Sequence, residues 1–455
     1  MTHHRRMTWG LGALMLLALV VLPAVSAQAS GPTPSTPIRH FVVLMQEGHS
    51  FDNYFGTYPG ADGLPADVCL PIDVNNVQKK SSCVRPYPIG DHSIEKMSHT
   101  AQVFALQRND GRMDGFVDAL RRRNQDGTVA MGYYTDADLP FYWNLADEYV
   151  LFDRFFSSAA AGNVWNRMFW LSATPGTSAY QIPAGGYLNV PTIFDALEQR
   201  GVSWKVYIQN YNPALTYHAA QDDGTMPAQV QRMPLLAMPR FVDTPALFKH
   251  IAGIDQYFED VRTGALPAVA YVVPTSASEY PPGRPENGQR FARGLINALM
   301  QSDAWNHAAF VLTYDDWGGW YDHVPPPQAD SYGYGFRVPT LLVSPYARRG
   351  YIDHTQLDHT ALLKFITANY GLTPLAQRDA QAGSLLGAFD FAQPPRPPHF
   401  LGMARGAAAP IEPRREVIYI FYSAALVLAG LILAGSALLA GRGPAARRTT
   451  SEGGV

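Results

Sequence analysis

The sequence has little cysteine, little net charge and no visible internal repeat. Its 455 residues include 2 cysteines, and 35 Lys and Arg nearly balance 38 Asp and Glu, which gives a net charge of −3. This near-neutral balance provides no electrostatic reason to expect a nucleic-acid partner. The two cysteines have no histidine between them at zinc-finger spacing, so a zinc–thiolate site is not expected either.

Long apolar runs near the two ends predict export and a membrane anchor. Residues 1–29 are typical of a secretory signal peptide, with two arginines, an apolar core and small residues at two possible cleavage sites. An uncleaved N-terminal anchor is the alternative. Residues 417–440 are uncharged and long enough to span a bilayer as a helix. Arginines follow this run, which predicts that the tail, 441–455, lies in the cytoplasm. We therefore expect a single-pass protein with its main domain, 38–395, on the extracytoplasmic face, flanked by linkers at 30–37 and 396–416.

Export changes the interpretation of the cysteine pair. Cys69 and Cys83 are separated by a polar, turn-rich segment. An even pair in an exported domain favours a disulfide. Closing a loop of this length would stabilise the fold by roughly 3 kcal/mol in the chain-entropy model.

The middle of the chain has the pattern of an α/β protein. Apolar, β-prone runs alternate with amphipathic helical stretches, and this alternation predicts a mostly parallel sheet with helices on both faces. The Pro-, Gly- and aromatic-rich insert at 56–145 is expected to form loops and short helices over the mouth of a site. The predicted strands are 38–45, 203–209, 268–273, 308–314 and 338–344, and the predicted helices are 192–201, 244–263, 287–302 and 356–370.

Carboxylates follow two of the predicted strands directly. The run 308–314 leads into Asp315 and Asp316 and then two glycines, and the run 38–45 is followed by Glu47. Sites in parallel α/β proteins lie at the carboxyl ends of strands, and paired carboxylates suit a hard divalent cation. A surface Asp-Asp turn that merely ends a strand is the alternative.

Several motifs in order resemble those of the bacterial phosphoesterase family, which includes non-haemolytic-type phospholipases C and acid phosphatases. The resemblance spans about residues 38–390 and is carried by Met45–Gly56, Gly111–Val117, Phe141–Asp147, Leu151–Ser157 and Asp315–Pro327. It implies a doubly wound, alkaline-phosphatase-like fold with one divalent metal ion at the carboxyl edge of the sheet. It also implies that a Ser or Thr hydroxyl at a helix start attacks phosphorus.

The resemblance assigns roles to individual residues. It implies that Glu47, Asp315 and Asp316 are metal ligands and that Asp322 and His323 support the aspartate pair. His92 and His99 match histidines near the phosphate, with loop or capping histidines as the alternative.

Three positions depart from the family pattern. Gly48 stands where the family has Asn, and Tyr280 stands where a His often follows Ser-Glu. Asn163 stands at the position of the nucleophile, and its amide is no practical nucleophile.

Two functions follow from this comparison. The first is an exported, membrane-anchored phosphoesterase of the phospholipase C or acid phosphatase type, which hydrolyses phosphate esters such as phospholipid headgroups with a metal ion. The second is a catalytically silent relative that binds a phosphate-bearing ligand. Whether the protein is an enzyme is open at this point, because Asn163 stands at the nucleophile position.

Overall fold

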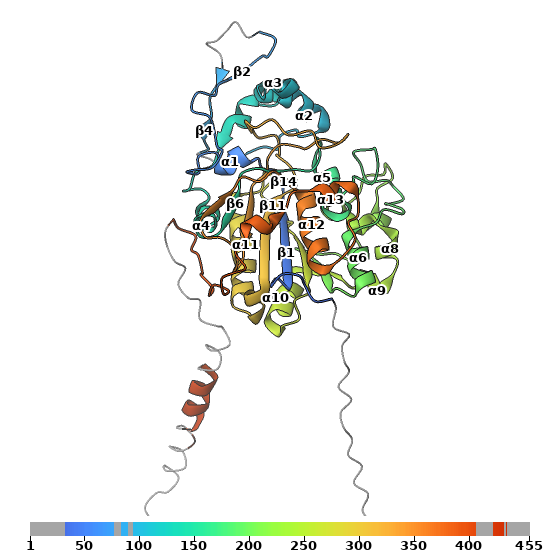
Figure 1. The fold of residues 1–455 in the computed structure, drawn as a ribbon, viewed down its shortest axis with the longest axis vertical. Helices are drawn as coiled ribbons and strands as arrows, with labels where there is room; N and C mark the ends of the chain where they lie inside the picture. The colour runs from blue at the N-terminus through green and yellow to red at the C-terminus, as the bar shows by residue number, and fades with distance from the viewer. Residues whose placement is uncertain (1–31, 77–82, 90–93, 406–421, 432–433, 435–455) are drawn as a thin grey trace, which may run out of the picture.

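An eight-stranded sheet forms the centre of the molecule (Figure 1). The computed structural model describes residues 32–76, 83–89, 94–405, 422–431 and 434. The strands run in the order β13-β6-β12-β11-β1-β10-β8-β9. Their bounds are Tyr351–Asp353 for β13, Val150–Phe152 for β6, Thr340–Val343 for β12, Ala308–Tyr314 for β11, His40–Gln46 for β1, Val269–Val273 for β10, Trp204–Ile208 for β8 and Ile251–Gly253 for β9.

The strand directions bring the chemically interesting residues to one edge. β1 lies between β11 and β10 and runs parallel to both, with Val43 opposite Val311 on one side and Tyr271 on the other. β8 and β9 continue the parallel run, whereas β12 is antiparallel to both of its neighbours. The carboxyl ends of β11, β1, β10 and β8 therefore meet at the same edge, as expected for a mostly parallel sheet.

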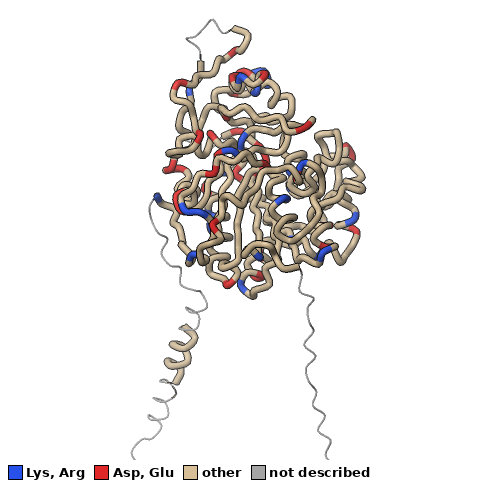
Figure 2. Tube along the Cα trace, in the orientation of Figure 1, with Lys and Arg blue, Asp and Glu red and all other residues tan. Residues whose placement is uncertain are grey.

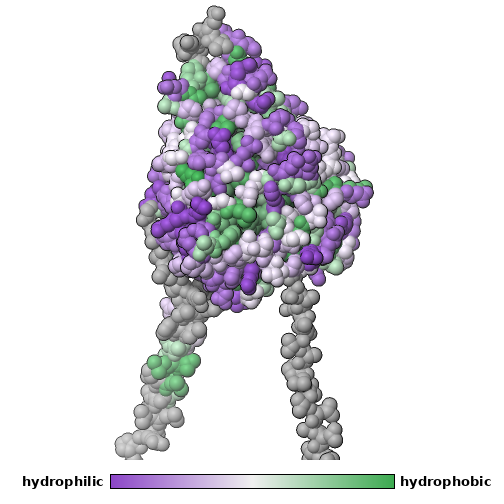
Figure 3. Space-filling model, viewed as in Figure 1, coloured by the Kyte–Doolittle hydropathy of each residue, from purple (hydrophilic) through white to green (hydrophobic). Residues whose placement is uncertain are grey.

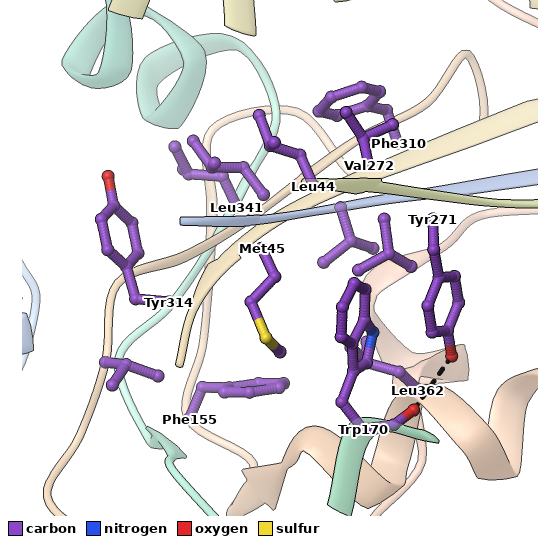
Figure 4. Packing of buried hydrophobic residues seen from close by; sticks show 14 of the residues in the cluster. Leu44, Met45, Phe155, Trp170, Tyr271, Val272, Phe310, Tyr314, Leu341 and Leu362 are labelled. Carbon is purple, nitrogen blue, oxygen red and sulfur yellow. Dashed lines mark hydrogen bonds between the residues drawn. The ribbon is translucent and has the colours of Figure 1, made fainter. Parts of the chain in front are cut away.

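The strands at the centre are buried on both faces, which explains their continuous apolar sequences. In Figure 4, Leu44 lies on one side of the sheet near Phe310, and the next residue, Met45, points to the other side toward Phe155. On that second side the ring of Trp170 stacks on Tyr271 at 4.1 Å between ring centroids. Successive side chains thus fill two separate layers of the core.

Helices pack on the sheet as the sequence pattern predicts. α5 (Asn163–Ser172) and α12 (His359–Tyr370) contact each other, and α10 (Ile254–Thr263) contacts α11 (Pro285–Met300). Figure 1 shows α11 and α12 on either side of β1. α6 (Ile193–Arg200) begins with a capping box between Thr192 and Asp195 and ends at Gly201, close to the predicted limits of 192–201.

One predicted helix is wrong in part. The stretch 244–263 contains α9 (Pro245–Phe248), then β9, and only then α10. Ile251 pairs with Val206 of β8, so this segment adds an edge strand to the sheet instead of forming one continuous helix. Pairing with the sheet offers backbone partners that outweigh the weak helical periodicity of this segment.

The insert at 56–145 covers the carboxyl edge of the sheet. It contains α2 (Ala101–Arg108), α3 (Phe116–Arg121) and the start of α4 (Pro140–Glu148), with α2 and α3 beyond the end of β11 in Figure 1. Gln107 of α2 donates from Nε2 to Gly319 O at 3.0 Å and accepts from Trp317 Nε1 at 2.6 Å. This amide anchors the insert on the turn that follows Asp315 and Asp316.

The predicted disulfide between Cys69 and Cys83 is confirmed, with their Cα atoms 5.4 Å apart. Cys69 directly precedes the short strand β2 (Leu70–Pro71), and Cys83 begins β3 (Cys83–Val84), which pairs antiparallel with β2.

The described parts of both predicted linkers contact the domain. Ser35 N donates to Asn369 O at 2.8 Å, and Arg396 Nη1 donates to Glu148 Oε1 at 2.8 Å.

Acidic and basic residues are interspersed along the chain in Figure 2.

The two predicted membrane-directed segments are described only in small part. The signal peptide, 1–29, lies outside the described residues, and of the span 417–440 the structure describes 422–431 and 434, as helix. Figure 3 shows the apolar surface of this short helix. Over the described ranges, no helix is both long and apolar enough to cross a membrane.

Candidate functional site

The ends of β1, β11 and β10 enclose a cavity of about 300 Å³, which we call the edge cavity. Glu47 and Gly48 follow β1, Asp315 and Asp316 follow β11, and Tyr280 lies in the loop after β10. Residues from the insert, from α5 and from α7 (Ala228–Arg232) complete the wall. The lining residues are Glu47, Gly48, Lys96, His99, Asn163, Ala228, Gln231, Arg232, Tyr280, Asp315 and Asp316.

The two adjacent aspartates have different surroundings. Asp315 Oδ1 accepts from the backbone N–H groups of Gly48 at 3.0 Å and of Asp316 at 2.8 Å, and its Oδ2 accepts from Arg167 Nε at 2.9 Å. Asp316 Oδ1 accepts from Gly318 N at 2.8 Å. Asp316 Oδ2 is buried, has no hydrogen-bond partner within the described part of the chain and lies 3.7 Å from His99 Nε2.

Burial dominates the electrostatics of both aspartates. Loss of solvent raises the pKa of Asp316 to about 7; nearby His99 lowers this pKa, and the charge of Asp315 adds to the rise. Burial likewise raises the pKa of Asp315, although the guanidinium of Arg167 opposes the shift.

Glu47 is held by protein donors on both oxygens. Arg232 Nε lies 3.0 Å from Oε1 and 3.0 Å from Oε2, and the Ser278 hydroxyl donates to Oε2. Arg167 Nη2 lies 3.5 Å from Oε1. The buried guanidinium of Arg167 therefore lies between Glu47 and Asp315, two of the residues predicted as metal ligands.

This arrangement does not fit a divalent cation. Both oxygens of Glu47 and of Asp315 already accept hydrogen bonds from the protein, which leaves Asp316 Oδ2 as the unpaired carboxylate oxygen of the three side chains. Within the described ranges, no group of three or more His, Cys, Asp or Glu is placed to hold a metal ion. Hard cations require several free oxygens that converge on one point. Here Arg167 and Arg232 supply the positive charge beside these carboxylates instead of a metal ion.

Asn163 is the first residue of α5, in the position predicted for the nucleophile. Gly162 precedes it without a side-chain cap, so the first N–H groups of the helix have no capping side chain. Arg167 follows one helical turn later. The nearest serines do not replace a nucleophile, because both are buried and the hydroxyl of Ser157 donates to Phe336 O while that of Ser158 accepts from His359 N.

Gly48 and Tyr280, two of the three departures from the family pattern, pack against each other. Gly48 has φ +63°, and a Cβ built on it would lie 2.4 Å from Cδ2 of Tyr280. The tyrosine ring thus fills the space that a side chain at position 48 would need. Its hydroxyl donates to Met97 O at 2.7 Å and lies 3.1 Å from His99 Nδ1.

The remaining predicted residues are distributed over several places. His99 lines the edge cavity, whereas His92 lies outside the described residues. Asp322 and His323 form a neighbouring network instead: Arg337 Nε donates to Asp322 at 2.9 Å, and His323 Nδ1 lies 2.7 Å from Asp52 Oδ2.

Sequence reasoning missed the arginines that hold the carboxylates. Arg167 carried a usable signal, because it lies four residues after Asn163 and therefore on the same face of a helix. Arg232 carried none, since nothing in the loop-rich segment around it points to Glu47, some 185 residues earlier.

Comparison with known proteins supports the family resemblance of the sequence motifs. A family model described as Phosphoesterase family matches residues 38–373. The chain belongs to the Phosphoesterase family. It is 31% identical over 464 residues to phospholipase C B of Mycobacterium tuberculosis, which covers 85% of this chain and 84% of the relative. It is 27% identical to the non-hemolytic phospholipase C of Pseudomonas aeruginosa over 79% of this chain and 58% of that protein.

Among solved structures, a Vibrio parahaemolyticus protein in the alkaline phosphatase superfamily is similar, with a TM-score of 0.36 and 11% identity over 78% of this chain and 72% of that one. A likeness at this level carries no argument about activity. The family membership predicted from the motifs is confirmed. The role of each residue in this member of the Phosphoesterase family depends on the site geometry above.

Proposed function

We propose that this protein binds phosphate esters, such as phospholipid headgroups, in the edge cavity and does so without a hydroxyl nucleophile. The position of Asn163 carries this proposal. It stands at the uncapped start of α5 and lines a cavity whose wall also contains Lys96 and Arg232. Helix N–H groups and cationic side chains are the donors that bind phosphate oxygens.

The chemistry of the site argues against a covalent intermediate. An amide side chain cannot form the phosphoryl-enzyme that a serine or threonine hydroxyl forms. The arginines of the site already neutralise Glu47 and Asp315, so a phosphate group meets a cavity whose acidic side chains are largely paired.

Hydrolysis by direct attack of water is the second candidate, and family membership supports it. One observation favours it: the unpaired Oδ2 of Asp316, 3.7 Å from His99 Nε2. A carboxylate in this position can accept a proton from a water molecule that attacks a bound phosphate.

We also propose that the protein is exported and held at the extracytoplasmic face of the cell membrane by residues 417–440. The support is the sequence of the two end segments. A membrane-held protein meets phospholipid headgroups at high local concentration, which agrees with a phosphate-ester ligand.

Calorimetry on the full chain in detergent tests the proposal. We expect the affinity for inorganic phosphate to be the same in EDTA as in Mg²⁺, because protein donors hold the phosphate. The same is expected of glycerol 3-phosphate. Arg232→Gln is expected to weaken binding by about tenfold or more, since a charge-assisted hydrogen bond is lost. Arg290→Gln is the matched control, because that arginine is exposed and pairs with Glu286 on α11.

The same preparation separates the two candidates. Binding without release of p-nitrophenol from p-nitrophenyl phosphate supports the silent protein. Turnover that disappears in Asp316→Asn, with phosphate binding retained, supports hydrolysis by water. Absence of phosphate binding at millimolar concentration would overturn both.

A further inference from the structure

A second pocket adjoins the edge cavity and has a different chemical character. Its volume is about 410 Å³, and we call it the aromatic pocket. It lies between the start of α2 and the start of α5. Its lining residues are Met97, Ser98, His99, Thr100, Ala101, Gln102, Gly162, Asn163, Val164, Trp165 and Tyr180.

Two rings form one wall of the aromatic pocket. Trp165 and Tyr180 lie 4.3 Å apart between ring centroids, and the indole N–H of Trp165 donates to Ala179 O at 2.6 Å. Behind Trp165, Tyr332 contacts it edge-on at 5.5 Å. Trp165 is thereby fixed, while Tyr180 is 52% exposed and leaves part of its ring open to solvent.

The two pockets are neighbours that share lining residues. His99 and Asn163 line both. A ligand whose phosphate lies at the start of α5 in the edge cavity is thus close enough for its remaining part to reach the aromatic pocket. No Asp, Glu, Lys or Arg lines this pocket in the described part of the chain.

We infer that the aromatic pocket binds the uncharged, planar organic group of the phosphate ester held in the edge cavity. This inference rests on the proposed function and narrows its phosphate esters to one class, aryl or similarly flat monoesters, in place of phospholipid headgroups. Stacking on Trp165 and Tyr180 supplies the preference, because aromatic faces attract flat rings beyond the effect of buried area alone.

A series of monoesters on the full chain tests this class. We expect phenyl phosphate to bind about tenfold more tightly than methyl phosphate, and phosphocholine to bind no more tightly than methyl phosphate. Tyr180→Ser is expected to reduce the phenyl-over-methyl preference to about threefold or less while the affinity for methyl phosphate is unchanged. Tyr87→Ser, which removes a 38% exposed tyrosine outside both pockets, is the control.

Each other outcome is decisive. Equal affinity for phenyl and methyl phosphate, or tighter binding of phosphocholine, overturns the inference. If methyl phosphate does not bind at all, the proposed function fails, and the pocket is then tested alone with phenol. The readout is the indole N–H resonance of Trp165, assigned by its loss in Trp165→Leu, and no shift with phenol overturns the aromatic pocket as well.

Discussion

At the scale of single residues, Gly48 and Tyr280 form a coupled pair. We expect Gly48→Asn alone to lower the free energy of unfolding by about 1–3 kcal/mol, because its Cβ would lie 2.4 Å from Cδ2 of Tyr280. Asparagine tolerates the positive φ at this position, so the clash is the main cost. In Gly48→Asn with Tyr280→His, the smaller ring is expected to recover at least about 1 kcal/mol. Urea unfolding of the single and double variants measures this coupling.

Gly201 provides the control for this cycle. It has φ +68° and a Cβ built on it would meet nothing within 4 Å, so Gly201→Asn tests the backbone effect without a clash. We expect it to be nearly neutral. Additive effects of Gly48→Asn and Tyr280→His would contradict the coupling.

The residues of the site could be predicted only in part. The motifs identified Glu47, Asp315 and Asp316 and showed that Asn163 replaces a hydroxyl, because short segments carry that information. They did not show that arginines hold two of these carboxylates, since an ion pair between Arg232 and Glu47 joins distant segments. Nor did they show that Gly48 and Tyr280 occupy one space, which only the packed structure contains.

At the scale of elements, a buried carboxyl joins a strand to two helices. Glu279 is fully buried and accepts from the hydroxyls of Tyr54 at 2.6 Å, Tyr314 at 2.5 Å and Tyr142. These tyrosines lie on α1 (Phe51–Phe55), β11 and α4. Burial raises the pKa of Glu279 from 4.5 to about 7, although the three hydroxyl donors lower it.

This shift predicts a pH dependence of stability. The folded protein keeps the Glu279 proton to higher pH than the unfolded chain, so the contribution of this group falls as pH rises from about 4.5 to about 7. The loss is expected to reach about 3.5 kcal/mol at most, at about 1.4 kcal/mol per pKa unit. Glu279→Gln keeps the shape and removes the titration. Urea unfolding of both proteins from pH 4.5 to 8 measures the difference, and parallel curves would contradict the prediction.

The sequence predicted the strands that are long and buried on both faces of the sheet. β1, β8, β10, β11 and β12 were all predicted, because continuous apolar runs are typical of central strands. β6, β9 and β13 have three residues each and too little sequence to show a period. These short strands form because they pair with strands that are distant in the sequence, and a short sequence segment holds no information about such pairing.

At the scale of the whole molecule, the membrane anchor remains a prediction from sequence. The span 417–440 is uncharged, and its described part carries Leu426 and Leu431 at the surface, 73% and 65% exposed. Such side chains cost free energy in water and gain it in a bilayer, at about 25 cal/mol per Å² of apolar surface removed from water. Placement in a membrane removes this cost.

Deleting residues 406–455 is therefore expected to move the protein from the membrane to the soluble fraction of a bacterial host, with its phosphate binding unchanged. Carbonate extraction followed by calorimetry measures both. Replacing Leu426 and Leu431 with arginine is the matched test in the full chain, because two charges at the centre of a helix raise the insertion free energy by about 5–7 kcal/mol. A full chain that already washes off in carbonate contradicts the anchor. A truncated chain that loses phosphate binding would instead show that the C-terminal segment supports the site. The deletion starts directly after Arg405, whose Nη1 donates to Asp147 Oδ2 at 2.8 Å and so ties the described end of the linker to the domain.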